Sequence, residues 1–257
     1  MPDTLVHLEV ANAIATITLD SQHNRNALSA ALVAQLRDHL GAAARDSNVR
    51  AIVLTHSGPT FCSGADLGEM THGDPAVSTR NMLGVMRAIV DAAKPVLGRL
   101  TGSARAGGIG LVGACDIALA SPDVTFAFTE VRLGLAPAMI SLTTRTRLSE
   151  RSAARYYLTG ETFDAAEAAR IGLLTEVVLD LDGAIARYLD ALRQCAPQGL
   201  EASKSISAGP LRSLLANEGD AMMELSARLF ASEEAREGMR AFRERRPPRW
   251  ASGPSAI

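Results

Sequence analysis

Cysteine is scarce in this 257-residue sequence, with only three residues, Cys62, Cys115 and Cys195. An odd set without metal-ligand spacing argues against a disulfide framework and indicates reduced thiols, as in a cytosol. Aromatic residues are also few, at 4% of the chain, whereas Gly and Ala are plentiful. We therefore expect packing that depends on the close approach of backbones.

The sequence also lacks a strong charge of either sign, a long apolar run and a cluster of metal ligands. Its formal net charge is −2, which does not suggest nucleic-acid binding. No apolar stretch reaches the roughly 20 residues of a membrane span, and MPDTLVHLEV lacks the pattern of a secretory signal. The histidines are scattered without ligand spacing. We expect a soluble, cytoplasmic protein without a metal, whose partners include neither nucleic acid nor membrane.

What the sequence does contain is an alternation of strand and helix patterns. Apolar and β-branched runs predict strands at 13–20, 51–58, 94–102, 116–121, 124–130 and 173–178. Amphipathic spacing predicts helices at 30–44, with Ser29 as the N-cap, and at 75–93. Most of the chain from Ser149 onward reads as helix, and no strand is expected beyond Pro197. This is an α/β layout, which we divide into a core of residues 1–195 and a helical C-terminal region of residues 196–257.

One glycine pattern suggests a dinucleotide site but stands in the wrong context. Gly108, Gly110 and Gly113 spell G-x-G-x-x-G, and Glu130 lies near the spacing of a ribose-binding acid. The glycines should open a full crossover helix, yet the strand pattern of 116–121 resumes after roughly two helical turns. The sequence therefore disfavours a nicotinamide cofactor.

Two other turns offer bare backbone to a ligand. FCSGADLGEM (61–70) follows the strand at 51–58, and GSARAGGIGL (102–111) follows the strand at 94–102. Each leads into an expected helix, so backbone N–H groups can face an anion. Two converging N–H groups would form an oxyanion hole, where each donor is worth about 2.7–4 kcal/mol in a transition state. Tight packing between a strand and a helix would explain either turn taken alone.

Several stretches together resemble the enoyl-CoA hydratase/isomerase family, or crotonase superfamily. They are HNRNALS, FCSGADL, GSARAGGIGLVGACDIALAS, FAFTEVRLGLAP and LTGETFDAAEAARIGLLTEVV. The resemblance extends from about residue 10 to AFRERRPPRW near the C-terminus. It implies a crotonase-like spiral of ββα units with a helical C-terminal trimerisation region, often in a dimer of trimers. It also implies an acyl-CoA thioester as partner, with no cofactor beyond the coenzyme A that the substrate carries.

The resemblance also assigns backbone donors and a strip that binds coenzyme A. The N–H groups of Ala65 and Gly107 take the positions of the family's oxyanion hole, which stabilises a thioester enolate. The coenzyme A strip matches Arg25, Asn26, Ala27, Ala65, Asp66 and Leu67. Asp66 serves equally well as a helix N-cap. Arg25 fits a solvated loop, although a cation there suits phosphates.

Family hydratases of the best-known type use two glutamates, and this sequence keeps one. The second glutamate matches Glu130, whereas the first falls on Gly110. Without the resemblance, Glu130 would be read as a surface acid at a strand end, paired with Arg132 or Arg145. A smaller departure is Ala106, where many relatives have glycine.

Three functions remain open for a site with one glutamate. The first is a hydratase in which Glu130 is the acid/base, and TEVRLGLAPAMIS looks like the bacterial methylglutaconyl-CoA and related branched-chain hydratases. The second is a Δ3,Δ2-enoyl-CoA isomerase, because moving one proton along one face needs a single carboxylate. The third is a non-catalytic acyl-CoA-binding relative, which has little reason to keep a buried acid.

Overall fold

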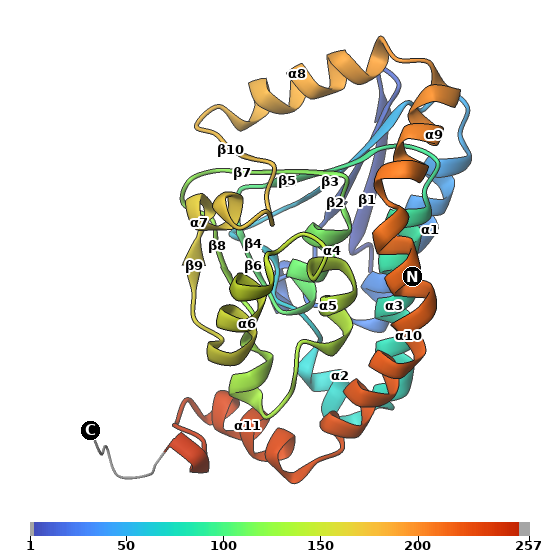
Figure 1. The fold of residues 1–257 in the computed structure, drawn as a ribbon. Helices are drawn as coiled ribbons and strands as arrows, with labels where there is room; N and C mark the ends of the chain where they lie inside the picture. Colours follow the sequence, from blue (N-terminus) through green and yellow to red (C-terminus); the bar gives the residue numbers. More distant parts are fainter. Residues whose placement is uncertain (1–2, 252–257) are drawn as a thin grey trace.

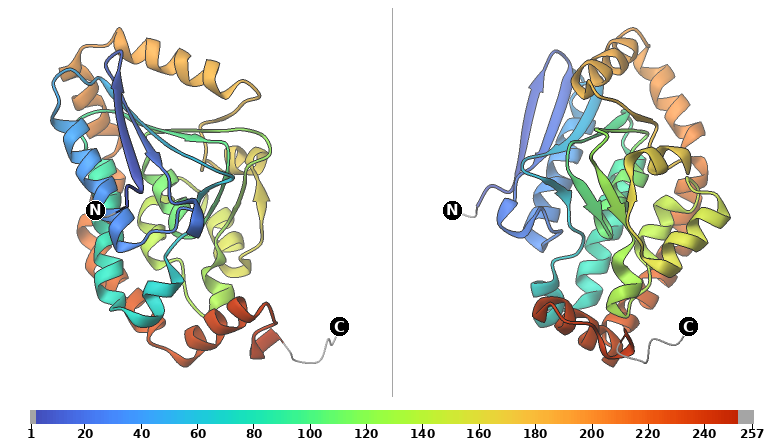
Figure 2. Two further views of the ribbon diagram at one scale, coloured as in Figure 1. Left: turned by 180° about the vertical axis from the view of Figure 1, so that it is seen from behind. Right: turned by 90° about the vertical axis from the view of Figure 1, so that its left-hand side faces the viewer.

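Two β-sheets lie at the centre of the molecule, and helices surround them (Figure 1). The structure is a computed structural model that describes residues 3–251. Helices α1 and α3 pack on one face of the larger sheet, helix α8 covers the other, and the C-terminal helices run down one side (Figures 1 and 2). This mixed α/β architecture is the crotonase-like fold that the resemblance implied.

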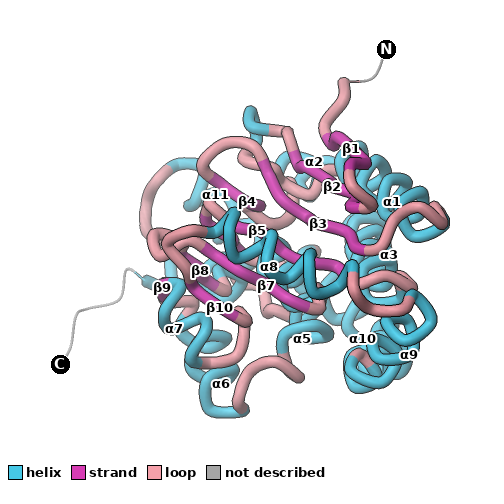
Figure 3. The backbone as a smooth tube through the Cα atoms, turned by 90° about the horizontal axis from the view of Figure 1, so that it is seen from above, coloured by secondary structure: helices cyan, strands magenta, loops and turns pink. Residues whose placement is uncertain are grey.

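The larger sheet has six strands in the order β1-β2-β3-β5-β7-β10, which Figure 3 shows from above. The pair β1 and β2 is antiparallel and the remaining pairs are parallel. The strands are β1 (Val6–Ala11), β2 (Ile14–Leu19), β3 (Ala51–His56), β5 (Val96–Leu100), β7 (Ile117–Ala120) and β10 (Glu176–Val177). All but β1 lie within predicted strands, although β10 fills only part of the predicted 173–178.

The smaller sheet has four short strands in the order β4-β6-β8-β9. They are β4 (Thr60–Cys62), β6 (Ser103–Arg105), β8 (Thr125–Ala127) and β9 (Phe163–Asp164). The chain passes from β3 to β4, from β5 to β6 and from β7 to β8, so each pass adds one strand to each sheet before the next helix. The predicted strand at 124–130 is wrong at its end, because β8 stops at Ala127 and Glu130 lies in the 3-10 helix η2 (Thr129–Leu133).

The helices explain why β3 is buried throughout. Ile52 and Leu54 belong to the main core with α1 and α3, whereas Ala51 and Val53 contact residues of α8, so both faces of the strand are buried. Ser29 caps α1 as predicted, since its hydroxyl accepts the Leu32 N–H at 3.3 Å. The helices are α1 (Ala30–Arg45), α2 (Leu67–His72), α3 (Pro75–Asp91), α4 (Gly107–Ala114), α5 (Ala138–Thr144), α6 (Glu150–Thr159), α7 (Ala165–Arg170), α8 (Leu181–Arg193), α9 (Pro197–Ser207), α10 (Gly209–Phe230) and α11 (Glu233–Glu244), with short η1 (Gln22–Asn24) and η3 (Arg249–Ala251). None of the helices within residues 3–251 has the length and apolar character of a membrane span.

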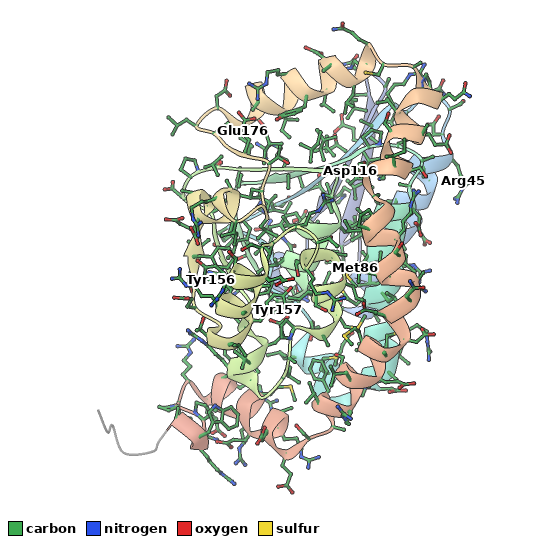
Figure 4. All side chains as sticks on the ribbon, in the orientation of Figure 1. Arg45, Met86, Asp116, Tyr156, Tyr157 and Glu176 are labelled. Carbon is green, nitrogen blue, oxygen red and sulfur yellow. The ribbon has the colours of Figure 1, made fainter. Side chains whose placement is uncertain are left out.

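A buried ion pair ties the C-terminal helices to the core. Lys204 on α9 is 4% exposed, and its ammonium lies 2.8 Å from the Asp116 carboxylate, which is labelled in Figure 4. The same ammonium donates hydrogen bonds to the carbonyls of Ile89 and Lys94 at 2.9 and 3.0 Å. Helix α10 then lies along α3 and α5. The division of the chain at residue 195 stays a prediction.

We expect Lys204→Met to lower the free energy of unfolding by about 3–5 kcal/mol, because it leaves the Asp116 carboxylate without its counter-ion. Urea unfolding monitored by circular dichroism measures this loss. Arg187→Met is the control, since its ion pair with Glu176 is solvent-exposed and should contribute less than about 1 kcal/mol. Equal losses in the two variants would contradict this account.

Candidate active site

The two turns that the sequence singled out and the segment that carries Glu130 meet at one edge of the smaller sheet. Strands β4, β6 and β8 are parallel neighbours, so their carboxyl ends point to the same edge. The chain leaves β4 into Gly64 and Ala65, leaves β6 into Ala106 and Gly107, and leaves β8 toward Glu130. The short sheet therefore brings together residues that are far apart in the sequence.

The first two turns are in direct contact. Gly64 has a φ of +98°, which favours glycine, and a Cβ built on it would lie 2.8 Å from the Ala106 Cβ and 3.3 Å from the Gly107 nitrogen. The Gly64 carbonyl accepts the Leu28 N–H at 2.8 Å. A side chain at position 64 would thus force the two turns apart.

The N–H groups of Ala65 and Gly107 have no acceptor within residues 3–251. Gly107 opens α4, and the first N–H groups of a helix lack intrahelical partners. Ala106 precedes it with a φ of +44°, a strained conformation for a residue with a Cβ that costs of order 1–3 kcal/mol. The geometry thus leaves two backbone donors free, on turns that touch, with their residues only partly buried.

Glu130 is a half-buried residue whose carboxyl has no ion-pair partner among the described residues. Its Oε2 is inaccessible to solvent and has no hydrogen-bond partner among the described residues. Burial raises the pKa of its carboxyl from the ordinary 4.5 to about 7, and a hydrogen bond from its own backbone N–H opposes that rise only in part. Arg132 instead donates to the Thr159 carbonyl at 3.4 Å, and Arg145 pairs with Glu218 at 2.6 Å. The interpretation of Glu130 as a paired surface acid is therefore wrong.

A pair of hydroxyl groups lies near Glu130, and sequence reasoning missed it. The Tyr157 hydroxyl on α6 is 2.5 Å from the Thr144 hydroxyl on α5, and the ring of Tyr157 meets that of Phe128 with centroids 4.9 Å apart. Burial raises the pKa of Tyr157, and the charge of Glu130 acts in the same direction. Both residues lie inside helical stretches, so neither spacing nor composition could single them out.

Gly110 of α4 lies against side chains of both α3 and α5. A Cβ built on it would lie 2.8 Å from Ile140 Cγ2 and 2.9 Å from Met82 Cε. Its carbonyl accepts the Thr143 hydroxyl at 2.9 Å. The space that a second glutamate would need is therefore filled by apolar side chains of the neighbouring helices.

The residues matched to the coenzyme A strip have unequal freedom to bind a ligand. The Asn26 side chain is buried and committed, since it accepts the Ser21 N–H and donates to the carbonyls of Ser57 and Thr60. The Asp66 carboxylate caps α2 at Gly68 and Glu69 and also accepts from Asn24. This geometry favours the N-cap reading of Asp66. Ala27 is buried, Leu67 is half-buried and Arg25 is exposed.

Neither the thiols near the turns nor any metal site adds chemistry within the described residues. Burial raises the pKa of the Cys62 and Cys115 thiols to about 12, so both stay protonated at neutral pH and are poor nucleophiles. No group of three or more His, Cys, Asp and Glu residues among the described side chains is placed to hold a metal ion. The chemistry available to the site is thus that of the Glu130 carboxyl, the nearby hydroxyls of Tyr157 and Thr144, and the backbone donors.

Comparison with known proteins decides the family. The family model for enoyl-CoA hydratase/isomerase matches residues 9–253. The chain belongs to the enoyl-CoA hydratase/isomerase family. It is 31% identical over 246 residues to the 2,3-dehydroadipyl-CoA hydratase of Escherichia coli, covering 91% of this chain and 94% of that one.

Other members of the family give the same assignment. A protein named "Probable enoyl-CoA hydratase" from Rhizobium meliloti is 34% identical over 240 residues, covering 91% of this chain and 93% of its own. A crystal structure of an enoyl-CoA hydratase from Mycobacterium avium superposes with a TM-score of 0.91 at 49% identity, covering 96% of this chain and 99% of that one. These likenesses confirm the fold and the family, whereas the roles of individual residues stay predictions.

We expect Glu130→Gln to stabilise the protein at pH 8 but not at pH 4.5. The folded carboxyl has a pKa of about 7 and the unfolded one about 4.5, so only the folded state holds the proton between these values, and wild-type stability falls as the pH rises through them. The shift of about 2.5 units corresponds to about 3 kcal/mol above pH 7. Urea unfolding of both proteins from pH 4.5 to 8 measures the difference, and a difference independent of pH would contradict the raised pKa.

We expect Gly110→Ala to cost about 1–3 kcal/mol of stability, because its Cβ overpacks the contact with Ile140 and Met82. Gly110→Glu should cost more and should not create a two-glutamate enzyme. Gly199→Ala on α9 is the matched control, since a Cβ there meets nothing within 4 Å. Thermal unfolding compares the three variants, and a Gly110→Glu protein as stable as wild type would show that the space is open.

Proposed function

We propose that the protein adds water to the double bond of a 2-enoyl-CoA thioester, with Glu130 as its acid/base and the N–H groups of Ala65 and Gly107 as its oxyanion hole. The observation that carries the proposal is the Glu130 carboxyl, whose Oε2 is enclosed and unpaired among the described residues, at the same sheet edge as two free backbone donors. An isolated buried carboxyl costs stability. A catalytic role as a base would give the protein a reason to keep this carboxyl despite the loss of stability.

The proposed reaction needs one proton carrier and one site for negative charge. The Glu130 carboxylate takes a proton from water as the water oxygen bonds to the β-carbon of the thioester. The electrons of the double bond move toward the thioester oxygen, and the two N–H groups stabilise the resulting enolate. The carboxyl of Glu130 then returns its proton to the α-carbon, so water is added in full and the enzyme is regenerated.

The raised pKa of Glu130 suits this double role. A group that must first accept and later donate a proton works best when its pKa lies near the working pH. At a pKa of about 7, both protonation states are populated at neutral pH. One carboxyl can therefore serve where two glutamates act in the best-known hydratases.

The substrate is proposed from the family and from the sequence detail. The match of TEVRLGLAPAMIS to branched-chain hydratases favours a branched, methylglutaconyl-type acyl group. Coenzyme A would lie along Arg25, Asn26, Ala27, Ala65, Asp66 and Leu67. Since Asn26 and Asp66 use their side chains internally, we expect these two to contribute backbone and shape, and Arg25 to contribute charge. A trimer or a dimer of trimers and a cytoplasmic location complete the proposal.

One observation is also consistent with the isomerase alternative. The space beside Gly110 holds apolar side chains and no second carboxylate. Isomerisation moves a proton from C2 to C4 of a 3-enoyl-CoA and needs no bound water, so Glu130 alone suffices for it. A non-catalytic binding protein is less consistent with an acid buried at this cost.

We expect the protein to hydrate a 2-enoyl-CoA, and Glu130→Gln to lower kcat at least about a hundredfold while changing KM by only a few fold. Incubation with 2-enoyl-CoA and 3-enoyl-CoA thioesters, including 3-methylglutaconyl-CoA, is followed by mass spectrometry. Hydration adds the mass of one water molecule, whereas isomerisation leaves the mass unchanged.

The outcomes separate the three functions. A shifted double bond without water addition would support the isomerase instead. Binding of CoA thioesters without any turnover would support the non-catalytic relative. If the Glu130→Gln variant turns over a good substrate with the kcat of the wild type, Glu130 is not the acid/base.

A further inference from the structure

Helix α11 lies directly against the 3-10 helix that carries Glu130. A Cβ built on Gly238 of α11 would lie 2.5 Å from the carbonyl carbon and 2.7 Å from the Cα of Leu133, the last residue of η2. A Cβ built on Gly134 would lie 2.7 Å from the Glu234 carbonyl carbon and 2.9 Å from the Ala235 nitrogen. Two backbones approach here without a side chain between them. Figure 1 shows α11 at the end of the molecule where this contact lies.

The contact is transmitted to Glu130 through main-chain hydrogen bonds. The Leu135 N–H donates to the Glu130 carbonyl at 3.0 Å, and the Gly134 N–H donates to the Val131 carbonyl at 3.4 Å. These bonds close η2 onto the segment that α11 touches. A shift of Leu133 or Gly134 would therefore move the backbone of Glu130.

The same helix also touches the first of the two turns with free N–H groups. Leu135, Ala235 and Met239 form a small buried cluster separate from the main core. Leu67, two residues beyond Ala65, packs against this cluster, as do Leu133 and side chains from the end of α10. The cluster thus joins the Ala65 turn and the Glu130 helix through one helix of the C-terminal region.

A buried carboxylate on α11 binds the chain segment that follows this helix. Glu237, adjacent to Gly238, is 8% exposed. It accepts hydrogen bonds from the Arg246 guanidinium at 2.7 and 3.0 Å, from Arg240 at 3.1 Å and from the Arg249 N–H at 3.1 Å. The chain after α11 is therefore folded back onto it. Ser232 caps its start by accepting the Ala235 N–H at 3.1 Å.

We propose that α11 is a positioning element, in which Gly238, seated on Leu133, fixes the distance between Glu130 and the Ala65 turn. The catalytic meaning of this role rests on the proposed function. Gly238 touches no reacting atom, so it acts only through η2. A misplacement of about 1 Å by a remote change can lower a rate by about a hundredfold.

The test is Gly238→Ala with Gly199→Ala as the matched control. In a helix without tertiary contact, Gly→Ala favours the helix, so the control should keep wild-type kinetics and an equal or higher melting temperature. Gly238→Ala should lower kcat at least about tenfold with KM within about threefold. Hydrogen exchange should become faster in the peptide spanning residues 129–135. Wild-type kcat and wild-type exchange in a folded Gly238→Ala protein would overturn the proposal.

Two further experiments test the proposal if Gly238→Ala does not fold or if the protein has no hydratase activity. If Gly238→Ala does not fold, Met239→Ala is the second variant, because it removes a side chain of α11 from the same cluster. Met239→Ala should lower kcat several-fold with KM retained. Wild-type kinetics in Met239→Ala would overturn the proposal. If the wild-type protein hydrates no 2-enoyl-CoA, the proposed function fails by itself. The exchange of residues 129–135 in Gly238→Ala then decides the positioning role alone, with faster exchange supporting it and unchanged exchange overturning it.

Discussion

The parallel pairing of β4, β6 and β8 is the constraint on which the candidate site depends. Each of these strands has three residues, so few hydrogen bonds join them, yet they set the spacing of the two turns and of the segment that carries Glu130. The Ala106 N–H reinforces that spacing by donating to the Ala127 carbonyl at 3.2 Å. The rest of the fold supports this edge, with the larger sheet behind it and the C-terminal helices beside it. Backbone groups, held by backbone contacts, supply most of the site.

The central group of the candidate site, the Glu130 carboxyl, lowers the stability of the fold when it is charged. A carboxyl without a counter-ion must either lose its charge or lower the stability of the fold. The surrounding residues keep cations away from Glu130, since Arg132 and Arg145 are bonded elsewhere. The nearby hydroxyls of Tyr157 and Thr144 bond to one another. This arrangement gives up stability at neutral pH and leaves a proton carrier whose two states are close in energy.

Sequence patterns predicted the parts of the fold that depend on long, regular runs. The strand at β3, the cap at Ser29 and the helix at α3 follow from apolar spacing and one hydroxyl. Of the smaller sheet, only β8 lies within a predicted strand, because β4, β6 and β9 have too few residues to show any period. Strand β1 was missed because it is largely exposed. The end of the predicted strand at 124–130 was wrong because Thr129 and Glu130 turn into a 3-10 helix, which an apolar run followed by a polar residue does not reveal.

In the candidate site, too, some features could be predicted from the sequence and others could not. The glycines and Glu130 could be found from the sequence, because their roles depend on residue type in a recognisable order. The commitment of Asn26 to a neighbouring loop, the filling of the space beside Gly110 by Ile140 and Met82, and the contact of Gly238 with Leu133 could not. Each depends on which atoms meet across the fold, and a one-dimensional pattern does not carry that information.

The contact between Gly64 and Ala106 has a consequence for how this turn can change in evolution. The methyl group of Ala106 occupies the space that a side chain at position 64 would need, so the cost of a change at one position depends on the residue at the other. With glycine at 106, a small residue at 64 would lose its shortest contact, that with the Ala106 methyl, and keep the strain of the positive φ and the tight backbone contacts with Arg105 and Gly107. With alanine at 106, position 64 is confined to glycine. Epistasis between these two positions therefore restricts the order in which substitutions can accumulate. A substitution at position 64 would be tolerated better after Ala106→Gly than before it.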